Sequence, residues 1–195
     1  MRIVVAIGLV AMFANTAHAR QDERLDLGGA AGYAKALHGD LDFGAPAMSA
    51  SARVRVARHV ALEGEVGYWQ HTVRNTFRIA SAIFETRTTH RFPAVGLNVL
   101  AIADAGARIA PYGGAGVGLF HHISEYEQTG PHEMLFPIRN SDWRISMGGQ
   151  FVGGVDVRVA SQLKAYGEFR FDIQSFRDPG SSSTRVLGGL RVPIW

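Results

Sequence analysis

His122 and Ser124, followed by several acidic residues, have the side-chain types that nucleophilic catalysis needs. A serine hydroxyl becomes a nucleophile when a neighbouring imidazole removes its proton, and a carboxylate can orient that imidazole. The acidic candidates are Glu125, Glu127 and Glu133. This combination suits the transfer or hydrolysis of acyl groups. A histidine near a serine in a polar segment is more often only a solvated pair, so we expect no catalytic activity.

The same polar segment contains residue types that can bind metal ions. The candidate ligands are His121, His122, Glu125, His132 and Glu133. Their spacing matches no standard site, and the chain has no cysteine that could supply a thiolate. The glycine-rich run 113–118 also lacks the spacing of a phosphate-binding loop, and we expect no helix after it. The sequence therefore predicts neither a metal nor a cofactor.

The first 19 residues have the pattern of a secretory signal peptide. Met1-Arg2 is a basic start, residues 3–14 are almost wholly apolar, and Ala17-His18-Ala19 is a small-x-small ending. The apolar run is shorter than the roughly 20 residues that a transmembrane helix requires. We predict cleavage before Arg20, which gives a signal peptide at 1–19 and a single mature domain at 20–195.

Two long alternating segments, 143–159 and 163–173, must position the candidate residues. Every second residue of each segment is apolar or glycine, and the charged residues fall in between. A period of two indicates strands, because successive side chains of a strand point to opposite faces. Only about three residues separate the segments, so they form a hairpin. About 9–11 residues are enough for a tilted strand to cross the hydrocarbon core of a bilayer.

The same alternation predicts six further strands. The eight expected strands cover 25–33, 48–57, 61–72, 90–101, 108–121, 143–159, 163–173 and 184–195. The connections between them alternate between long and short, and the longest are 73–87 and 122–141. Short turns at one end and long loops at the other are typical of an antiparallel up-and-down barrel in an outer membrane. Ten strands would leave too few residues for these loops, so the sequence predicts an all-β, eight-stranded transmembrane barrel.

The alternation alone does not say which face is outside. In a soluble, lipocalin-like barrel the apolar face lines the cavity, and this alternative stays open. Three features favour lipid outside: nearly charge-free apolar faces, the asymmetry of the connections, and aromatic residues near strand ends, namely Tyr33, Tyr68, Trp143 and Phe171. With lipid outside, the charged residues point inward: Arg53, Arg55, Glu63, Glu65, Arg144, Asp156, Arg158, Lys164, Glu168, Arg170, Asp172, Arg185 and Arg191.

An eight-stranded barrel is just wide enough for its own side chains, so inward charges must form ion pairs. We expect a salt-bridged core and no wide channel. Pairing Ala57 with Ala61 places Arg55 opposite Glu63, and Arg53 then faces Glu65. Gly114, Gly116 and Gly118, on the inward face of their strand, would leave room for neighbouring arginines.

The run Pro111-Tyr112-Gly113-Gly114-Ala115-Gly116-Val117-Gly118 and the segment Gly189-Leu190-Arg191-Val192 near an aromatic C-terminus resemble the small outer-membrane β-barrel family. This family includes the opacity-type proteins and the OmpA transmembrane domain. The resemblance covers 25–195 and rests on the pattern more than on a sharp motif. Trp195 matches the terminal aromatic residue that the barrel assembly machinery recognises in such proteins. Arg191 and Pro193 share its face, where the family has apolar residues, so the orientation of Trp195 stays open.

The resemblance implies a monomer in the Gram-negative outer membrane, with a non-catalytic adhesion, envelope or structural role. Implied partners are membrane lipid, lipopolysaccharide, the assembly machinery at the C-terminal strand, and a host or surface ligand at the loops. A net charge of +3 without a basic run argues against nucleic acid. One enzymatic alternative is open, because His122-Ile123-Ser124 resembles the His-x-Ser of outer-membrane lipid A deacylases. It lies on a different strand, however, and lacks the asparagine that follows in those enzymes.

Overall fold

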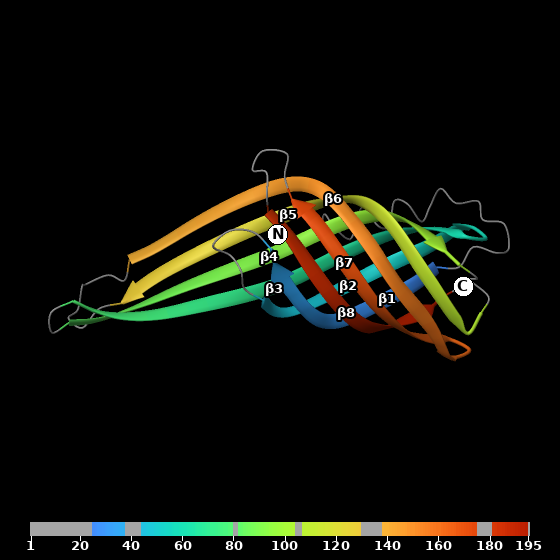
Figure 1. The fold of residues 1–195 in the computed structure, drawn as a ribbon, viewed down its shortest axis with the longest axis horizontal. Coiled ribbons are helices and arrows are strands. Elements are labelled where there is room, and N and C mark those ends of the chain that lie inside the picture. The colour runs from blue at the N-terminus through green and yellow to red at the C-terminus, as the bar shows by residue number, and fades with distance from the viewer. Residues whose placement is uncertain are drawn as a thin grey trace.

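The computed structural model describes residues 25–37, 44–79, 82–103, 107–129, 138–174 and 181–194, which form one closed antiparallel barrel (Figure 1). Each strand pairs with its neighbours in the sequence, and β1 closes the barrel against β8. Among these residues there is no helix long and apolar enough to cross a membrane. The strands are β1 (Leu25–Ala36), β2 (Gly44–Ala57), β3 (Val60–Ile79), β4 (Ala82–Ile102), β5 (Ile109–Thr129), β6 (Ile138–Ala160), β7 (Leu163–Gln174) and β8 (Ser181–Pro193).

The predicted faces are confirmed, with apolar side chains outside and charged side chains inside. Val117 is 60% exposed, and Ile145 on the neighbouring strand is 62% exposed. Arg53 and Arg170, by contrast, are only 2% and 1% exposed. Since a water-soluble barrel needs the reverse arrangement, the lipocalin-like alternative is wrong. Tyr33 and Trp143 also point outward, as an aromatic girdle at the membrane boundary requires.

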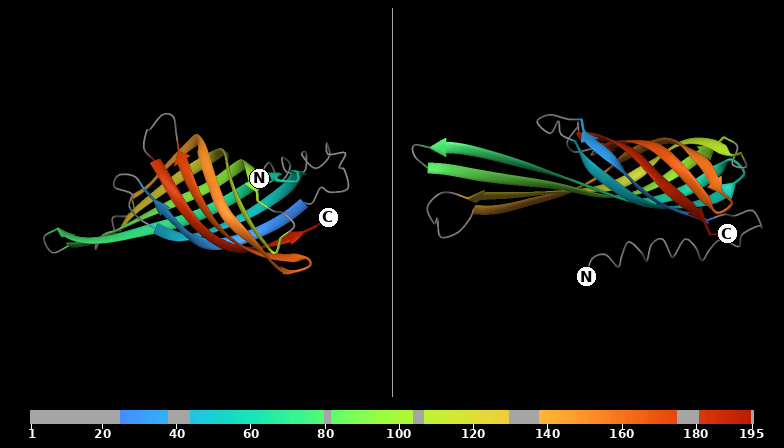
Figure 2. Two further views of the ribbon diagram at one scale, coloured as in Figure 1. Left: turned by 45° about the vertical axis from the view of Figure 1, so that its right-hand side comes forward. Right: turned by 90° about the horizontal axis from the view of Figure 1, so that it is seen from below.

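Four consecutive strands are much longer than the other four. Strands β3 to β6 have 20, 21, 21 and 23 residues, whereas β1, β2, β7 and β8 have 12, 14, 12 and 13. The excess length projects from one side of the barrel, to the left in Figure 1, and the right-hand panel of Figure 2 shows it from below. We call this projection, residues 70–79, 82–91, 121–129 and 138–144, the extended sheet.

The extended sheet corrects the two longest predicted connections. Most of 73–87 is a continuous β3–β4 hairpin that pairs as far as Ile79 and Ala82. Much of 122–141 is strand as well, since β5 continues to Thr129 and β6 begins at Ile138. Cross-strand pairs such as Phe77 and Phe84, whose stacked rings lie 5.4 Å apart, hold this region together. The asymmetry between the two ends of the barrel therefore lies mainly in strand length.

Smaller corrections concern strand ends. Strand β1 continues to Ala36, β2 already begins at Gly44, and β8 begins at Ser181, so the predicted connections beside them are shorter than expected. The turn at Arg58-His59 is tight, as predicted. The signal peptide, the cleavage site before Arg20 and Trp195 lie outside the described residues.

The register of β2 and β3 differs from the predicted one. Arg53 lies opposite Glu63, and Ser51 lies opposite Glu65, because the pairing shifts at an irregularity between Arg55 and Ala57. The expected Arg55–Glu63 pair is therefore wrong, and Arg55 faces Ala61.

Candidate functional site

Ion pairs fill the barrel interior at the level of Glu63. This carboxylate bridges two arginines, with its Oε2 atom 2.8 Å from Arg53 Nη2 and its Oε1 atom 2.6 Å from Arg170 Nη2. Asp156 accepts a 3.1 Å hydrogen bond from Arg53 Nη1 and a second one from Arg191. These residues come from β2, β3, β6, β7 and β8, so the network ties distant parts of the barrel wall together.

A second group of ion pairs lies next to the first. Glu65 accepts hydrogen bonds from Arg170 Nη1 at 2.9 Å and from Arg185 Nη1 at 2.7 Å. Arg185 Nε also donates to Asp172 Oδ2 at 3.0 Å, and Gln150 Nε2 donates to Asp172 Oδ1 at 2.9 Å. Each of the four buried arginines, Arg53, Arg170, Arg185 and Arg191, lies within 4 Å of at least two carboxylates. The expected salt-bridged core is thus present.

Not every residue that we predicted to face the core is buried in it. Arg144 is a surface residue with a side chain 68% exposed, and it pairs with Asp142 beyond the end of the barrel. Arg55 and Arg158 are half-buried at the short-turn end of the barrel. Sequence reasoning missed Asp26, which is buried and accepts a 2.7 Å hydrogen bond from Lys164. Asp26 lies in a segment of small residues where alternation is weak.

The glycines of β5 do not make room for arginines, as the sequence suggested. A Cβ atom at Gly116 would lie 2.0 Å from the Leu97 carbonyl oxygen and 2.4 Å from Asn98 Oδ1. Glycines on other strands do lie against arginines: a Cβ at Gly67 on β3 would lie 2.4 Å from Arg185 Nη1, and one at Gly28 on β1 would lie 3.3 Å from Arg191 Nε. These glycines permit close approach of β4 to β5 and of Arg185 to the wall.

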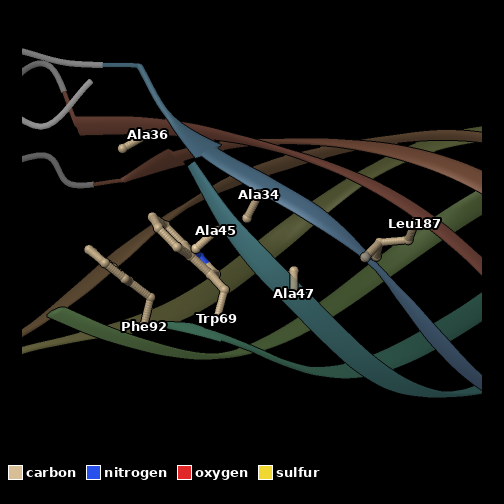
Figure 3. Close-up of a cluster of buried hydrophobic side chains, with 7 residues drawn as sticks. All are labelled: Ala34, Ala36, Ala45, Ala47, Trp69, Phe92 and Leu187. Atoms are coloured by element: carbon tan, nitrogen blue, oxygen red, sulfur yellow. The ribbon is translucent and has the colours of Figure 1, made fainter. Parts of the chain in front are cut away.

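Side chains leave little free space in the interior. One recess of about 20 Å³ lies among Arg55, Ala107 and Lys164 at the short-turn end, and one of about 10 Å³ lies beside Trp69 and Phe120. Such volumes hold about one water molecule. Near the second recess the rings of Trp69 and Phe92 stack with centroids 3.9 Å apart, and they belong to the same buried cluster as the alanines drawn in Figure 3. The interior therefore works as a packed core.

The predicted catalytic pair lies on a strand and not in a loop. His122 and Ser124 are two residues apart on β5, and both belong to the face of the extended sheet that continues the barrel interior. Glu125 and Glu127 belong to the opposite face, where they pair with Arg91 and Arg139. They cannot serve as acidic partners of His122, because period two separates the two faces. Glu133 lies outside the described residues.

The structure places two unpredicted residues beside Ser124. The backbone register sets His90 on β4 and Asp142 on β6 directly opposite it. Among the described residues, however, Ser124 forms no hydrogen bond with either histidine. Instead, His90 Nδ1 lies 3.1 Å from His122 Nε2, so one ring donates an N–H to the other. The serine therefore lacks the hydrogen bond to a base that activates a nucleophile.

On β4 and β5 the two histidines lie beyond Val95 and Leu119, the last strongly exposed apolar side chains of the barrel wall, at the level where Trp143 of β6 marks the membrane boundary. The His122 ring also stacks on Phe92 with a centroid distance of 4.6 Å. Burial lowers the pKa of His90, and the nearby His71 lowers it further. Burial also lowers the pKa of His122, with His90 as the next cause. Both shifts favour neutral rings, and the ring that accepts the shared hydrogen bond must be neutral.

The residues considered as metal ligands are not brought together. His121 and His122 are adjacent on β5, so their side chains point to opposite faces. Glu125 is engaged by Arg91 at 2.7 Å, and His132 and Glu133 lie outside the described residues. Within the described ranges, no group of three or more histidine, cysteine, aspartate or glutamate side chains has the spacing of a metal site.

A closed barrel with lipid-compatible walls, an ion-paired core and one extended rim defines a small transmembrane β-barrel. A family model supports this assignment independently, because the outer membrane protein beta-barrel domain matches residues 4–185. The chain belongs to this family, which places it in the outer membrane. The sequence-based resemblance and fold class are thereby confirmed.

Solved structures of several surface barrels share the fold. A major outer membrane protein from Thermus thermophilus matches with a TM-score of 0.63 and 9% identity, over 89% of this chain and 100% of that one. Neisserial surface protein A matches at 0.56 and 14%, over 86% and 96%. The attachment invasion locus protein Ail of Yersinia pestis, in complex with the heparin analogue sucrose octasulfate, matches at 0.57 and 10%, over 88% and 97%. No curated protein sequence matches the chain.

Proposed function

We propose that this chain is a non-catalytic outer-membrane surface protein, in which the barrel is an anchor and the extended sheet is the interaction surface. The observation that carries the proposal is the contrast within β3 to β6: inside the barrel their inward side chains are buried, several of them in ion pairs, but beyond it most side chains of both faces are exposed or half-buried. Binding residues are typically found on such exposed segments, held in place by a rigid scaffold.

The orientation follows from the two ends of the barrel. In outer-membrane barrels the short turns face the periplasm and the longer segments face outward. Here the β2–β3 and β6–β7 turns are short, at Arg58-His59 and Ser161-Gln162, whereas the extended sheet lies at the opposite end. The extended sheet is therefore extracellular in our proposal. Adhesion and envelope integrity are the roles that this placement supports.

Three features support a non-catalytic role. Among the described residues Ser124 has no hydrogen-bonded base, Glu125 and Glu127 form ion pairs with arginines on the opposite face, and the two small recesses have no room for an acyl chain. We also propose that the chain is a monomer, that β8 carries the signal for the assembly machinery, and that export uses the predicted signal peptide.

An epitope tag tests the orientation. A tag between Ile79 and Ala82 should bind antibody on intact cells, whereas one between Ser161 and Gln162 should bind only after the outer membrane is permeabilised. The untagged protein is the control for antibody background. Heat-modifiable migration of each tagged protein shows that its barrel folds. The reverse labelling pattern would refute the extracellular placement of the extended sheet.

Planar bilayers test the anchor role. Because side chains fill the interior, the purified barrel should produce no ion-conductance steps, while a large porin measured in parallel should produce them. Regular conductance steps from the folded barrel would show that the interior is a pore, and the anchor role would then fail.

A further inference from the structure

One face of the extended sheet continues the lipid-facing surface of the barrel. Strand β3 carries Val66 and Tyr68 on its outer face, and the same alternation places Arg74 and Arg78 on that face further up. On β4, Arg87 and Arg91 likewise follow the outward Val95. We call this surface the outer face of the extended sheet. Its side chains extend over the surrounding outer leaflet and not over the barrel interior.

Arginines outnumber acidic residues on this outer face. Its charged residues, apart from His121, are Arg74, Arg78, Arg87, Arg91 and Arg139 together with Glu85, Glu125 and Glu127. Two of the glutamates are already neutralised, Glu125 by Arg91 at 2.7 Å and Glu127 by Arg139 at 2.9 Å. The charge that is left over is concentrated on β3 and β4.

Arg74 and Arg87 lie directly opposite each other on β3 and β4. Both are exposed, and no carboxylate among the described residues lies within ion-pair distance of either. Like charges in directly opposed positions destabilise a sheet, so the chain gains nothing from this pair by itself. A multivalent anion between the two guanidinium groups would turn the repulsion into attraction, because guanidinium binds phosphate in a bidentate manner.

The height of Arg74 and Arg87 above the membrane indicates which phosphate groups they can reach. Tyr68 marks the aromatic girdle, and Arg74 lies six residues further along β3. With a rise of about 3.3 Å per residue and a tilt of about 40°, Arg74 lies roughly 15 Å above the girdle. The headgroup layer of a bilayer leaflet is only about 5–8 Å thick. Arg74 and Arg87 therefore lie above the lipid A headgroups, at the level of the first sugars of the core oligosaccharide.

We propose that the outer face of the extended sheet binds the phosphorylated core oligosaccharide of lipopolysaccharide in the protein's own membrane, with Arg74 and Arg87 holding the phosphate groups. This inference rests on the extracellular orientation proposed above. Lipopolysaccharide is the occupant that fits, because it surrounds the barrel at all times and its core sugars present phosphates beside this face. Arg78, four residues beyond Arg74 on the same face of β3, extends the site outward.

The test compares two charge-matched double variants in nanodiscs. R74Q/R87Q removes the opposed pair, and R58Q/R108Q removes two exposed arginines from the short-turn end. Each protein is titrated with lipopolysaccharide that has a phosphorylated core, with the same molecule lacking core phosphate, and with lipopolysaccharide truncated to lipid A. Heat-modifiable migration confirms that every variant is folded.

R74Q/R87Q should weaken binding of the phosphorylated form about tenfold, the loss expected for two exposed ion pairs. It should leave the other two forms unaffected, and R58Q/R108Q should bind like the wild type. The weakening should also diminish at high salt. Equal affinity of R74Q/R87Q and the wild type for the phosphorylated form would overturn the proposal.

Two further outcomes would also overturn it. An equal loss with lipid A alone would move the contact down to the membrane surface. In a parallel titration with heparin, a loss of heparin binding without a loss of lipopolysaccharide binding would assign the outer face to a sulfated polymer from outside the cell. Neither result would affect antibody access to the tag between Ile79 and Ala82, so failure of this inference and failure of the proposed orientation are distinguishable.

Discussion

The barrel interior and the extended sheet both contain arginine–glutamate ion pairs, but these pairs differ in how much they contribute to stability. The Arg53–Glu63 pair and the Arg91–Glu125 pair are similar in length, at 2.8 Å and 2.7 Å. The side chains of the first are 2% and 0% exposed, but those of the second are 38% and 44% exposed. Water and salt screen the exposed pair, while the buried charges have lost their hydration and depend on each other. Burial, and not contact distance, decides what an ion pair contributes.

Removing one acid from each pair tests this difference and should give the largest effect. Glu63→Ala leaves three buried arginines short of a carboxylate, and we expect it to cost about 3–5 kcal/mol of unfolding free energy. Glu125→Ala should cost about 1 kcal/mol or less. Urea titrations of both variants in lipid vesicles measure the two costs. Similar losses for the two variants would mean that water reaches the barrel interior.

Two glycines of the barrel test how tightly its wall is packed. Gly116→Ala places a methyl group 2.0 Å from a backbone oxygen of β4, so we expect a cost of about 1–3 kcal/mol. Gly149, on neighbouring β6, has no atom within 4 Å of an added Cβ, which makes Gly149→Ala the matched control. The same titration should show little change for the control. If the two alanines behave alike, close approach of β4 and β5 is not a constraint on the wall.

Lowering the pH should weaken the base of the extended sheet by a smaller amount. Between Arg91–Ile123 and Ala94–Phe120 the β4–β5 ladder has no paired residues, and a hydrogen bond joins His122 of this interval to His90, which lies just beyond it on β4. The lowered pKa values mean that the folded protein binds fewer protons than the unfolded chain. The stabilisation is therefore present above about pH 6.5 and is lost as the pH falls.

We expect a loss of about 1 kcal/mol between pH 8 and pH 5.5, measured by urea titration at each pH. The charged neighbours that act on the pair are His71 from β3, His121 from β5, and Asp142 and Arg144 from β6. His122→Phe keeps a ring on Phe92 but removes the hydrogen bond and should reduce the pH dependence. A wild-type protein as stable at pH 5.5 as at pH 8 would contradict a structural role for the pair.

The smallest effect is expected at Ser124. Ser124→Ala should change the unfolding free energy by no more than about 0.5 kcal/mol and should leave lipid A unaltered. His122→Ala should also leave lipid A unaltered. Mass spectrometry of lipid A from strains that carry each variant makes the measurement. A lipid A species that both variants lose, and that the wild type produces, would favour the deacylase-like alternative over a non-catalytic surface protein.

Sequence periodicity predicted the barrel well because its two faces meet different surroundings. Between 143 and 159, lipid on one side and ion pairs on the other impose a strict alternation. In the extended sheet neither face packs against an ion-paired core and most side chains are exposed or half-buried, so strands such as 73–79 and 82–87 show no amphipathic signal, and the sequence predicts connections there. Their polar and β-branched residues fit a sheet equally well, but nothing in their order shows it.

Register and closure were harder to predict than the strands themselves. Arginines at 53 and 55 and glutamates at 63 and 65 repeat with the period of a strand, so a shift of two residues still places one arginine, Arg53, opposite one glutamate, Glu63. The irregularity after Arg55 decides between the two registers, and charge pairing alone cannot detect it. The contacts of Arg170 and Arg185 with Glu65 depend on how β7 and β8 close against the rest of the barrel. Such contacts join residues more than 100 positions apart, which no local pattern specifies.

The unequal strand lengths also give the molecule a direction within the plane of the membrane. Strands β3 to β6 are consecutive, so the rim is a tall wall on one side and a low edge on the side of β7, β8, β1 and β2. Rotation of the barrel about the membrane normal therefore changes what a laterally diffusing neighbour encounters. Among the residues that the structure describes, the low side offers a neighbour the lipid-facing wall of the barrel, and the tall side also offers it the arginines of the outer face. What a neighbour contacts therefore depends on the side of the barrel from which it approaches in the plane of the membrane. The unequal strand lengths cause this dependence.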